Sequence, residues 1–386
     1  MIVIYFDNSA TTQVNPEALD TYIKVTKDIW GNPSSLHKFG DRSHQLLEAS
    51  RNQIAKLLGV NSTEIYFTAS GSESDNWAIK GTALAKKAFG KHIITSSVEH
   101  AAVSHSIRML ENEGFDVTVL PVDSNGLVDP KDLANSIRSD TILVSIMGVN
   151  NEIGAIQPIV EISKILEKYP NITFHVDNVQ ALGKAIWSRV FTSRVDLMSL
   201  SAHKFHAPRG VGILYKKQGK MLVPLIDGGG QEGGLRSGTE NLPAIAATAK
   251  AMRLYLANEK DYVARENQIK EKIINYLSHK PGIHIFSPIN DNFVSSILCF
   301  ALEGIRGETL VHTLEKYDIY ISTTSACSSR SSLESSTLQA MRIDNNIAES
   351  AVRLSFDDTN TLEEAKQFIE IFDGIYQHFA KINHLN

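Results

Sequence analysis

A lysine lies between two histidines at the end of an apolar run, in the stretch SLSAHKFHAPRG at residues 199–210. An amine at such a place can be ordinary surface charge, or it can be held out of water and form a Schiff base with an aldehyde. Lysine is mostly a surface residue, so Lys204 alone does not decide between the two. The decision depends on which polar residues accompany it.

Three other polar sites follow strand-like runs in the same part of the chain. Asp177 ends NITFHVD, His100 ends HIITSSVEH, and a loop of small residues at 69–72 follows EIYFT and opens a helix. Ligands of open α/β sheets bind beyond the carboxyl ends of the strands. We therefore expect these residues to face one crevice together with Lys204.

The chemistry of this set fits a single ligand. A helix start with Gly71 and Ser72 offers free N–H groups to a phosphate. Asp177 can hold a pyridinium proton, His100 can lie over an aromatic ring, and Lys204 can bind an aldehyde. Each residue also has an ordinary structural explanation, such as a turn or cap for the aspartate. Their order along the chain favours pyridoxal 5′-phosphate (PLP) as the common ligand.

The elements that must position these residues alternate between strand and helix. From about residue 46 to 215, continuous apolar strands are followed by helical stretches, which is typical of a mostly parallel sheet covered by helices. A long helical stretch runs from Pro243 to about residue 278, and the remainder resembles a smaller α+β unit. We expect an α/β fold with a large domain at 16–259 and a small domain formed by 1–15 and 260–386.

Composition excludes several classes of function. The net charge of −5 over 386 residues argues against direct nucleic-acid binding, which needs a basic face. The apolar runs are strand-sized, so no membrane span is expected, and the N-terminal stretch is typical of a strand and not of a signal peptide. The two cysteines exclude a disulfide scaffold or a four-cysteine metal site, and a cytoplasmic location is expected.

The sequence as a whole resembles the cysteine desulfurases of the NifS/IscS type, in class V of the PLP-dependent enzymes. The resemblance covers essentially the entire chain. It rests on stretches that occur in the family's order: YFDNSATT, NPSSLHKFG, FTASGSESDN, SSVEHAAV, VNNEIGAIQP, FHVDNVQALGK, SLSAHKFHAPRGVG, GGGQEGGLRSGT, SACSS and VRLS. It implies a PLP-dependent transferase type I fold with a seven-stranded sheet in the large domain.

The resemblance also implies an activity and partners. L-cysteine would be converted to L-alanine, and its sulfur would form a persulfide on an enzyme cysteine. The sulfur would then pass to an acceptor protein, either an iron–sulfur scaffold or a tRNA-thiolation enzyme.

The resemblance implies a role for each matching position. Lys204 would bind the cofactor covalently and move substrate protons, and Asp177 would pair with the ring nitrogen. Gln180 would bind the ring hydroxyl, and His100 would stack on the ring as a possible acid or base. The other assignments are Gly71, Ser72, Ser201 and His203 for the phosphate, Asn151 for cofactor and substrate, Arg353 for the substrate carboxylate, and Thr239 for the phosphate of a neighbouring subunit's cofactor.

Two of these assignments have further consequences. The role of Thr239 implies a homodimer with shared active sites. That of Arg353 has a clear physical basis, because a guanidinium matches a carboxylate with two parallel hydrogen bonds.

The two cysteines differ in their surroundings. Cys327 lies in the serine-rich segment 322–337, although free cysteines are usually buried. The family places its sulfur-accepting cysteine here, and a mobile loop suits a thiolate that attacks in the pocket and then carries sulfur outward. Cys299 lies in an apolar run and is expected to be an inert core residue.

The sequence departs from the family's pattern at two places. Arg330 stands near a usual glycine, and Ser335 replaces a usual proline. Beyond Arg353, the chain has Asp357 and Asp358 where the family often has a glycine and a basic residue. We expect these two carboxylates to weaken the local positive potential and to alter partner docking.

Three other functions compete with this interpretation. Residues 228–233 match G-x-G-x-x-G, but neither a following helix nor the acidic residue of a nicotinamide site is present. We interpret them as a flexible loop that brings Arg236 and Thr239 to a subunit boundary.

Metal binding and a related PLP reaction are the other two alternatives. His203 with His206, or His100 with His105, could bind a metal, but we see no cysteine or carboxylate that completes a set. A selenocysteine lyase, or another class V lyase or aminotransferase, would share Lys204 and Asp177. The serine-rich segment around the second cysteine favours cysteine as the substrate.

Overall fold

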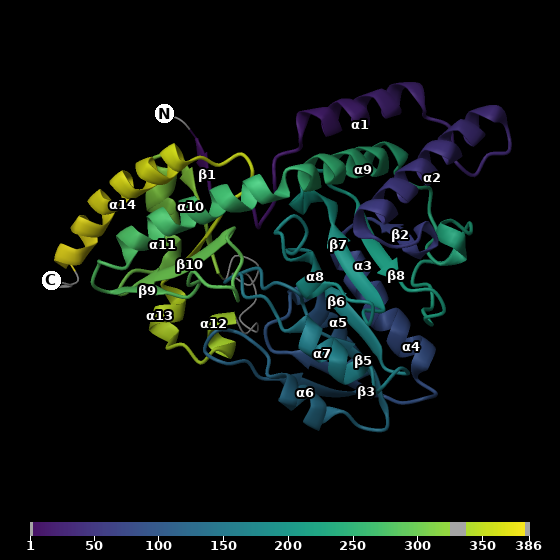
Figure 1. The fold of residues 1–386 in the computed structure, drawn as a ribbon, viewed down its shortest axis with the longest axis horizontal. Helices are drawn as coiled ribbons and strands as arrows, with labels where there is room; N and C mark the ends of the chain where they lie inside the picture. The colour runs from purple at the N-terminus through teal and green to yellow at the C-terminus, as the bar shows by residue number, and fades with distance from the viewer. Residues whose placement is uncertain (1–2, 325–336, 383–386) are drawn as a thin grey trace.

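A mixed sheet of seven strands forms the centre of the larger part of the molecule (Figure 1). The computed structural model describes residues 3–324 and 337–382. The strand order is β2-β8-β7-β6-β5-β3-β4, and only β8 runs antiparallel to its neighbours. The strands are β2 (Ile65–Thr68), β3 (His92–Ser96), β4 (Asp116–Leu120), β5 (Thr141–Ser145), β6 (Thr173–Asp177), β7 (Leu197–Ser201) and β8 (Gly212–Lys216). The predicted mostly parallel, seven-stranded sheet is confirmed.

The central strands are buried along their whole length, which explains their continuous apolar sequences. Helices therefore cover the sheet, and two of them begin at an N-cap residue followed by a proline, Asn15 for α1 and Asp129 for α6. These helices are α1 (Pro16–Asp28), α2 (Lys38–Leu58), α3 (Gly71–Asn76), α4 (Thr82–Lys86), α5 (Ala101–Asn112), α6 (Pro130–Ser136), α7 (Ile159–Leu166), α8 (Trp187–Val190) and α9 (Leu242–Ala257).

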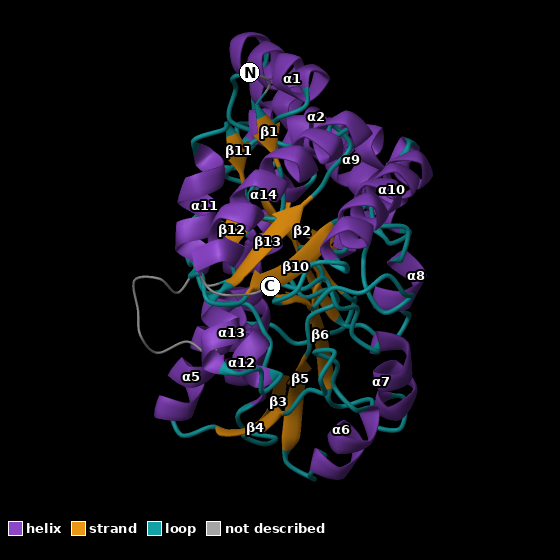
Figure 2. Cartoon of the chain, turned by 90° about the vertical axis from the view of Figure 1, so that its left-hand side faces the viewer, coloured by secondary structure: helices purple, strands orange, loops and turns teal. Residues whose placement is uncertain are grey.

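A second, antiparallel sheet has the order β12-β13-β10-β9. Its strands are β9 (Ile283–Ile285), β10 (Ile297–Leu302), β12 (Ser322–Thr323) and β13 (Ala351–Ser355). The helices of this part are α10 (Glu259–Leu277), α11 (Gly307–Glu315), α12 (Thr337–Ala340), α13 (Asn345–Glu349) and α14 (Leu362–Ile382). Figure 2 views the molecule from the side of this sheet. The predicted helical stretch after Pro243 is thus two helices, α9 and α10, which meet at Asn258.

The N-terminus packs with the C-terminal part of the chain. Strand β1 (Ile4–Tyr5) pairs in parallel with β11 (Ile319–Tyr320), and Phe6 contacts Phe356 edge to face at 5.1 Å. Both phenylalanines belong to an apolar cluster that also includes residues of α10, β10 and α14, separate from the cluster under the seven-stranded sheet. The segment after β1 therefore passes between the two sheets. None of the described helices is both long and apolar enough to cross a membrane.

Candidate active site

A cavity of about 1060 Å³ opens beyond the carboxyl ends of β3, β6 and β7, on the side facing the second sheet. Its wall contains most of the residues that the sequence predicted, namely Gly71, Ser72, His100, Asn151, Asp177, Gln180, Ser201, His203, Lys204 and Arg353. Cys327 lies outside the described residues. Thr239 is exposed and does not line the cavity of its own chain.

Lys204 lies in the turn directly after β7, where residues 9–15, the N-terminal segment, cover it. Its Nζ donates hydrogen bonds to the carbonyls of Ser9 and Ala10, the latter at 2.9 Å. The Thr12 hydroxyl donates to the carbonyl of His203 at 2.9 Å and so ties the same turn to this segment. The amine is thereby held at the cavity wall and is not free surface charge.

Asp177 ends β6 with its side chain buried, and its Oδ1 accepts from the N–H of Val179 at 2.9 Å. Burial raises the pKa of Asp177, while the neighbouring His100 and Lys204 oppose this rise. A cationic ring nitrogen beside this carboxyl group would favour the ionised form. Gln180 donates through Nε2 to the same Ser9 carbonyl that binds the lysine, at 3.0 Å.

The start of α3 forms the opposite end of the cavity. A Cβ atom on Gly71 would lie only 2.9 Å from the Cβ of Ser201, so glycine is required for this close approach. Burial lowers the pKa of His203 to about 4, with help from Lys204 and Arg209, which keeps that imidazole neutral. Small residues, hydroxyls and a neutral imidazole at this end fit a phosphate, and the amine and carboxyl group fit the ring of PLP.

His100 forms the N-cap of α5, where its Nδ1 accepts from the N–H of Ala102 at 3.1 Å. An accepting Nδ1 places the ring proton on Nε2 in the neutral imidazole. The cap fixes the ring at the cavity wall between β3 and α5. His100 can therefore stack on a planar ligand and donate a proton from Nε2.

Arg353 enters the cavity from β13 of the second sheet. It donates to the carbonyl of Asn151 and to Oδ1 of Asp7, each at 2.9 Å. Its Nε has no hydrogen-bond partner among the described residues, although it is buried. A buried donor without a partner is costly, so this arginine is suited to an incoming carboxylate.

Comparisons with known proteins agree with this arrangement. Residues 4–368 match the aminotransferase class-V family. The chain belongs to this family. A "NifS/IcsS protein homolog" of Lactobacillus delbrueckii subsp. bulgaricus is 70% identical, over 99% of this chain and 100% of that protein. "Cysteine desulfurase IscS" of Methanosarcina thermophila is 42% identical, over 99% and 94%.

Solved structures show the same fold. A "NifS-like protein" aligns with a TM-score of 0.91 and 38% identity, covering 98% of this chain and 100% of that one. "SspA in complex with cysteine" aligns with a TM-score of 0.80 and 33% identity, over 92% and 99%. Because the chain belongs to this family of PLP-dependent enzymes, its cofactor is PLP.

The cavity wall also contains acidic residues to which the sequence analysis assigned no role. Burial raises the pKa of Glu99 to about 8, and its Oε1 accepts from the Ser96 hydroxyl at 2.5 Å and the Met147 N–H at 3.0 Å. Burial also raises the pKa of Glu152, to about 7, and raises that of Asp75. The position of Glu99 directly before His100 was an available signal in the sequence.

The expectation that no carboxylate completes a metal-binding set was wrong, and so was the part of the docking expectation that concerned Asp357. No carboxylate was expected at His206, yet Asp357 and Asp358 lie 3.0 and 3.2 Å from its Nε2. These residues are far apart in the chain, so spacing gave no warning. The Asp357 side chain is only 1% exposed, so it cannot meet a docking partner as expected.

Cys299 is fully buried, and burial raises its pKa, as expected for an inert core thiol.

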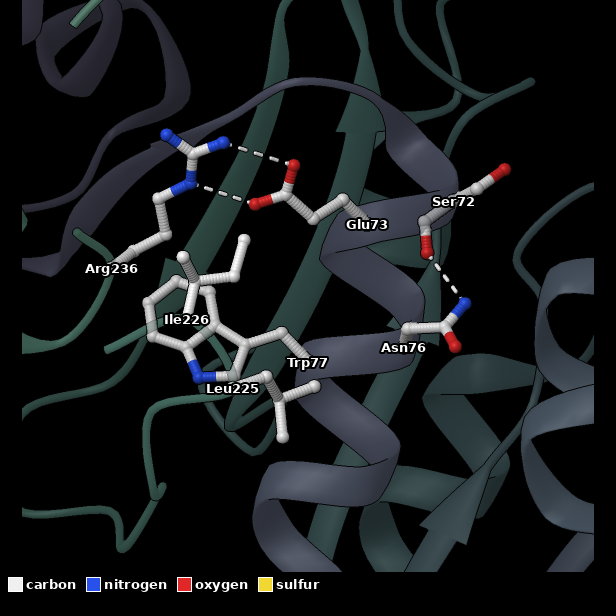
Figure 3. Close-up of a pocket in the computed structure, with 7 residues that line it drawn as sticks. All are labelled: Ser72, Glu73, Asn76, Trp77, Leu225, Ile226 and Arg236. Atoms are coloured by element: carbon white, nitrogen blue, oxygen red, sulfur yellow. Dashed lines mark hydrogen bonds and ion pairs between the residues drawn. The ribbon is translucent and has the colours of Figure 1, made fainter. Parts of the chain in front are cut away.

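The glycine-rich loop that contains residues 228–233 is held by ion pairs to other parts of the same chain. Arg236 binds Glu73 through two contacts of 2.7 and 3.1 Å (Figure 3). Beside this pair, a smaller pocket of about 310 Å³ has Trp77, Leu225 and Ile226 in its wall. The loop begins no long helix, which agrees with its rejection as a nicotinamide site. Its expected place at a subunit boundary stays a prediction.

Proposed function

We propose that this protein is a cysteine desulfurase, which converts L-cysteine to L-alanine and transfers the sulfur to Cys327 as a persulfide. One observation carries the proposal: Lys204, Asp177 and Arg353 line the same cavity. A reactive amine, a partner for a ring nitrogen and a carboxylate-binding group are what a PLP enzyme needs to act on an amino acid. Full-length relatives named cysteine desulfurase support the choice of substrate.

PLP, when bound, supplies an aldehyde for amines and a ring that accepts electrons from the substrate carbon. Asp177 would hold the proton on the ring nitrogen, and Gln180 would bind the ring hydroxyl. The residues around the start of α3 and the end of β7 would hold the phosphate: Gly71, Ser72, Ser201 and His203. His100 would stack on the ring.

The chain's own residues would then handle the substrate. Arg353 and Asn151 would bind the carboxylate and orient the α-carbon toward Lys204, whose amine would remove and return protons there. His100 would serve as a further proton donor through Nε2. The thiolate of Cys327 would attack the substrate sulfur, so that a sulfur–sulfur bond forms as the carbon–sulfur bond breaks. The electron pair of the broken bond would stay on carbon, which would take up the proton that Cys327 lost on ionising and so become the methyl group of alanine.

The proposal also covers the domains, the oligomeric state, the sulfur acceptor and the location of the protein. We propose the large domain at 16–259 and the small domain at 1–15 and 260–386, supported by two separate apolar clusters. A homodimer would bring Thr239 to the phosphate of the neighbouring cofactor, which agrees with its exposure here. The persulfide would pass to an iron–sulfur scaffold or a tRNA-thiolation enzyme. A free thiol that must stay reduced suits the cytoplasm.

Purified protein with PLP tests the proposal. We expect the absorbance of a lysine-bound cofactor and one alanine released for each L-cysteine consumed in the presence of a thiol. Faster turnover of selenocysteine than of cysteine would point to a selenocysteine lyase instead. No alanine from either substrate would refute the proposal.

The role of the cysteine is tested by a matched pair of variants. Cys327→Ser is expected to keep the cofactor absorbance and lose alanine formation from L-cysteine. Cys299→Ala, a change at the buried cysteine, is expected to retain it. Full activity in Cys327→Ser would remove that residue from the mechanism.

A further inference from the structure

His206 is held by three acceptor groups from two distant parts of the chain. Its Nδ1 lies 2.8 Å from the carbonyl oxygen of Gln13. Its Nε2 lies 3.0 Å from Oδ2 of Asp357 and 3.2 Å from Oδ1 of Asp358. The side chain is 6% exposed, so water cannot replace these contacts.

The contacts determine the protonation state of the ring. A carbonyl oxygen only accepts hydrogen bonds, and an ionised carboxylate does the same. The Nδ1 of His206 is thus hydrogen-bonded to Gln13, and its Nε2 lies in ion-pair contact with two carboxylates, whose negative charge favours the imidazolium. Burial lowers the pKa of His206, but the hydrogen bond and charge of Asp357, together with the charge of Asp358, outweigh it and raise the pKa to about 9.

The backbone of His206 shows that this placement is enforced. Its φ is +64°, in the left-handed region that side chains other than glycine rarely adopt. The N–H donates to the Thr12 hydroxyl at 2.9 Å, and the carbonyl accepts from the N–H of Asn15 at 2.9 Å. The N-terminal segment thus holds the residue in a strained conformation that presents its ring to the two aspartates.

Other titratable and charged side chains lie near the His206 ring, on the helices packed against it and on the segments that adjoin them. Tyr255 of α9 lies against it at 5.3 Å between centroids. The tyrosine hydroxyl accepts from Lys184 at 3.1 Å, and that lysine also pairs with Glu266 of α10 at 2.9 Å. Arg265 donates to the carbonyl of Asp358. The charges of Lys184 and His206 act on both aspartates, and that of Arg265 acts on Asp358.

The ion pair joins the two sides of the proposed active site. His206 is two residues beyond Lys204, and Asp357 is four residues beyond Arg353. Between these residues, Ser355 bonds to the N-terminal segment through the N–H of Ser9 at 2.8 Å. A change in the distance between His206 and Asp357 would therefore move Arg353 relative to Lys204.

We propose that the His206 imidazolium, held between Asp357 and Asp358, is a positioning group that fixes Arg353 of the second sheet at the correct distance from Lys204. This inference rests on the proposed function, because it assigns the distance to the binding of an amino-acid carboxylate near the reactive amine. His206 itself touches neither substrate nor cofactor. Its loss would weaken substrate binding more than it would slow the chemical step.

The same three side chains could instead bind a divalent metal ion, since their ligand atoms lie within 4.8 Å of one another. Lys184 and Arg265 argue against it, because a metal ion would add two positive charges among these cations. The imidazolium needs no further group, and it leaves the nearby charges compensated. Metal analysis separates the two possibilities.

The test compares steady-state kinetics of His206→Gln, Asp357→Asn and the double variant, with alanine as the measured product. We expect each single variant to raise KM for L-cysteine by about 10-fold, as for a buried ion pair that loses one partner, with kcat changed far less. The double variant should be no worse than either single variant, because both remove one interaction. Asp358→Asn, at a less buried position, serves as a second variant if Asp357→Asn fails to fold.

The matched control is His312→Gln. It makes the same change at an exposed pair, in which His312 lies 3.2 Å from Glu315, and should leave KM unchanged. The ratio of KM between His206→Gln and the wild type should also fall toward 1 as the pH rises above about 9, where the wild-type imidazolium loses its proton. Titration of the substrate cancels in this ratio.

The outcomes are distinct. Unchanged KM in His206→Gln, or additive effects in the double variant, would overturn the positioning role and leave the desulfurase activity intact. Wild-type protein that forms no alanine would refute the proposed function instead. The ion pair would then still be tested by the thermal midpoints of the same variants, which should show the same non-additivity. A stoichiometric divalent metal that is lost in His206→Gln would overturn the imidazolium assignment.

Discussion

The guanidinium of Arg51 binds the carboxylate of Glu232 through two hydrogen bonds of 2.8 Å inside the protein. The Glu232 side chain is 1% exposed, and its Oε2 also accepts from the N–H of Phe67 at 2.8 Å. The pair thus connects the glycine-rich loop to α2 and to β2. Glu232 has a φ of +50°, so the loop holds it in a strained conformation for this contact.

Glu232→Gln should destabilise the protein by about 3 kcal/mol, because it leaves the Arg51 charge buried without its partner. Denaturant unfolding of the protein with PLP measures this change. Glu48→Gln is the matched control, since Glu48 binds the same arginine at 3.0 Å but is 40% exposed. That variant should cost less than about 1 kcal/mol. Equal losses of unfolding free energy in the two variants would show that the buried contact stabilises the protein no more than the exposed one.

Lys204→Ala should abolish the absorbance of lysine-bound PLP and reduce alanine formation by at least about 100-fold, because it removes the proposed general base. The fold should persist, since Lys204 lies in a turn at the cavity wall and belongs to no apolar cluster among the described residues. Lys24→Ala, at an exposed lysine of α1, is the control and should have no effect on either measurement. Retained cofactor absorbance in Lys204→Ala would place the attachment at another lysine.

Arg353→Lys should lower kcat/KM for L-cysteine by about 10- to 100-fold, mainly through KM, because an ammonium cannot match a carboxylate with two parallel bonds. The same variant loses one of the contacts to Asp7 and Asn151. Arg306→Lys, at a 72% exposed arginine, controls for the substitution itself. An unchanged KM would mean that another group binds the substrate carboxylate.

The stability of the protein should depend on pH through Glu152, whose pKa burial raises to about 7 from the ordinary 4.5. The folded state then holds a proton that the unfolded state releases. The stabilising contribution is complete below pH 4.5 and is lost as the pH rises to about 7. It amounts to something on the order of 3 kcal/mol.

Glu152→Gln removes this titration without changing the shape of the side chain. The free energy of unfolding of the variant should therefore improve relative to the wild type between pH 4.5 and 7, and then stay level. Thermal or denaturant unfolding at several pH values measures the difference. A difference that does not depend on pH would show that Glu152 is ionised throughout.

The residues at strand ends were predictable from the sequence alone. Asp177 ends one fully buried strand and Lys204 follows another, while His100 lies between a third strand and the start of a helix. Continuous apolar strands that alternate with helices form a parallel sheet, whose carboxyl ends lie along one edge. This local pattern is sufficient to bring the three side chains to one cavity, as the structure shows.

Contacts between distant segments were decided only by the tertiary structure. Arg353 meets Asp7 and His206 meets Asp357 because β1 packs beside β11 and Phe6 packs against Phe356. Nothing in the spacing of these residues indicates such pairs, since apolar periodicity states which face is buried but not what covers it. The sequence by itself therefore determined the large sheet and the residues at its edge. Packing of a second apolar core decided which charged groups close the cavity from the other side, because that packing depends on long-range shape and not on local pattern.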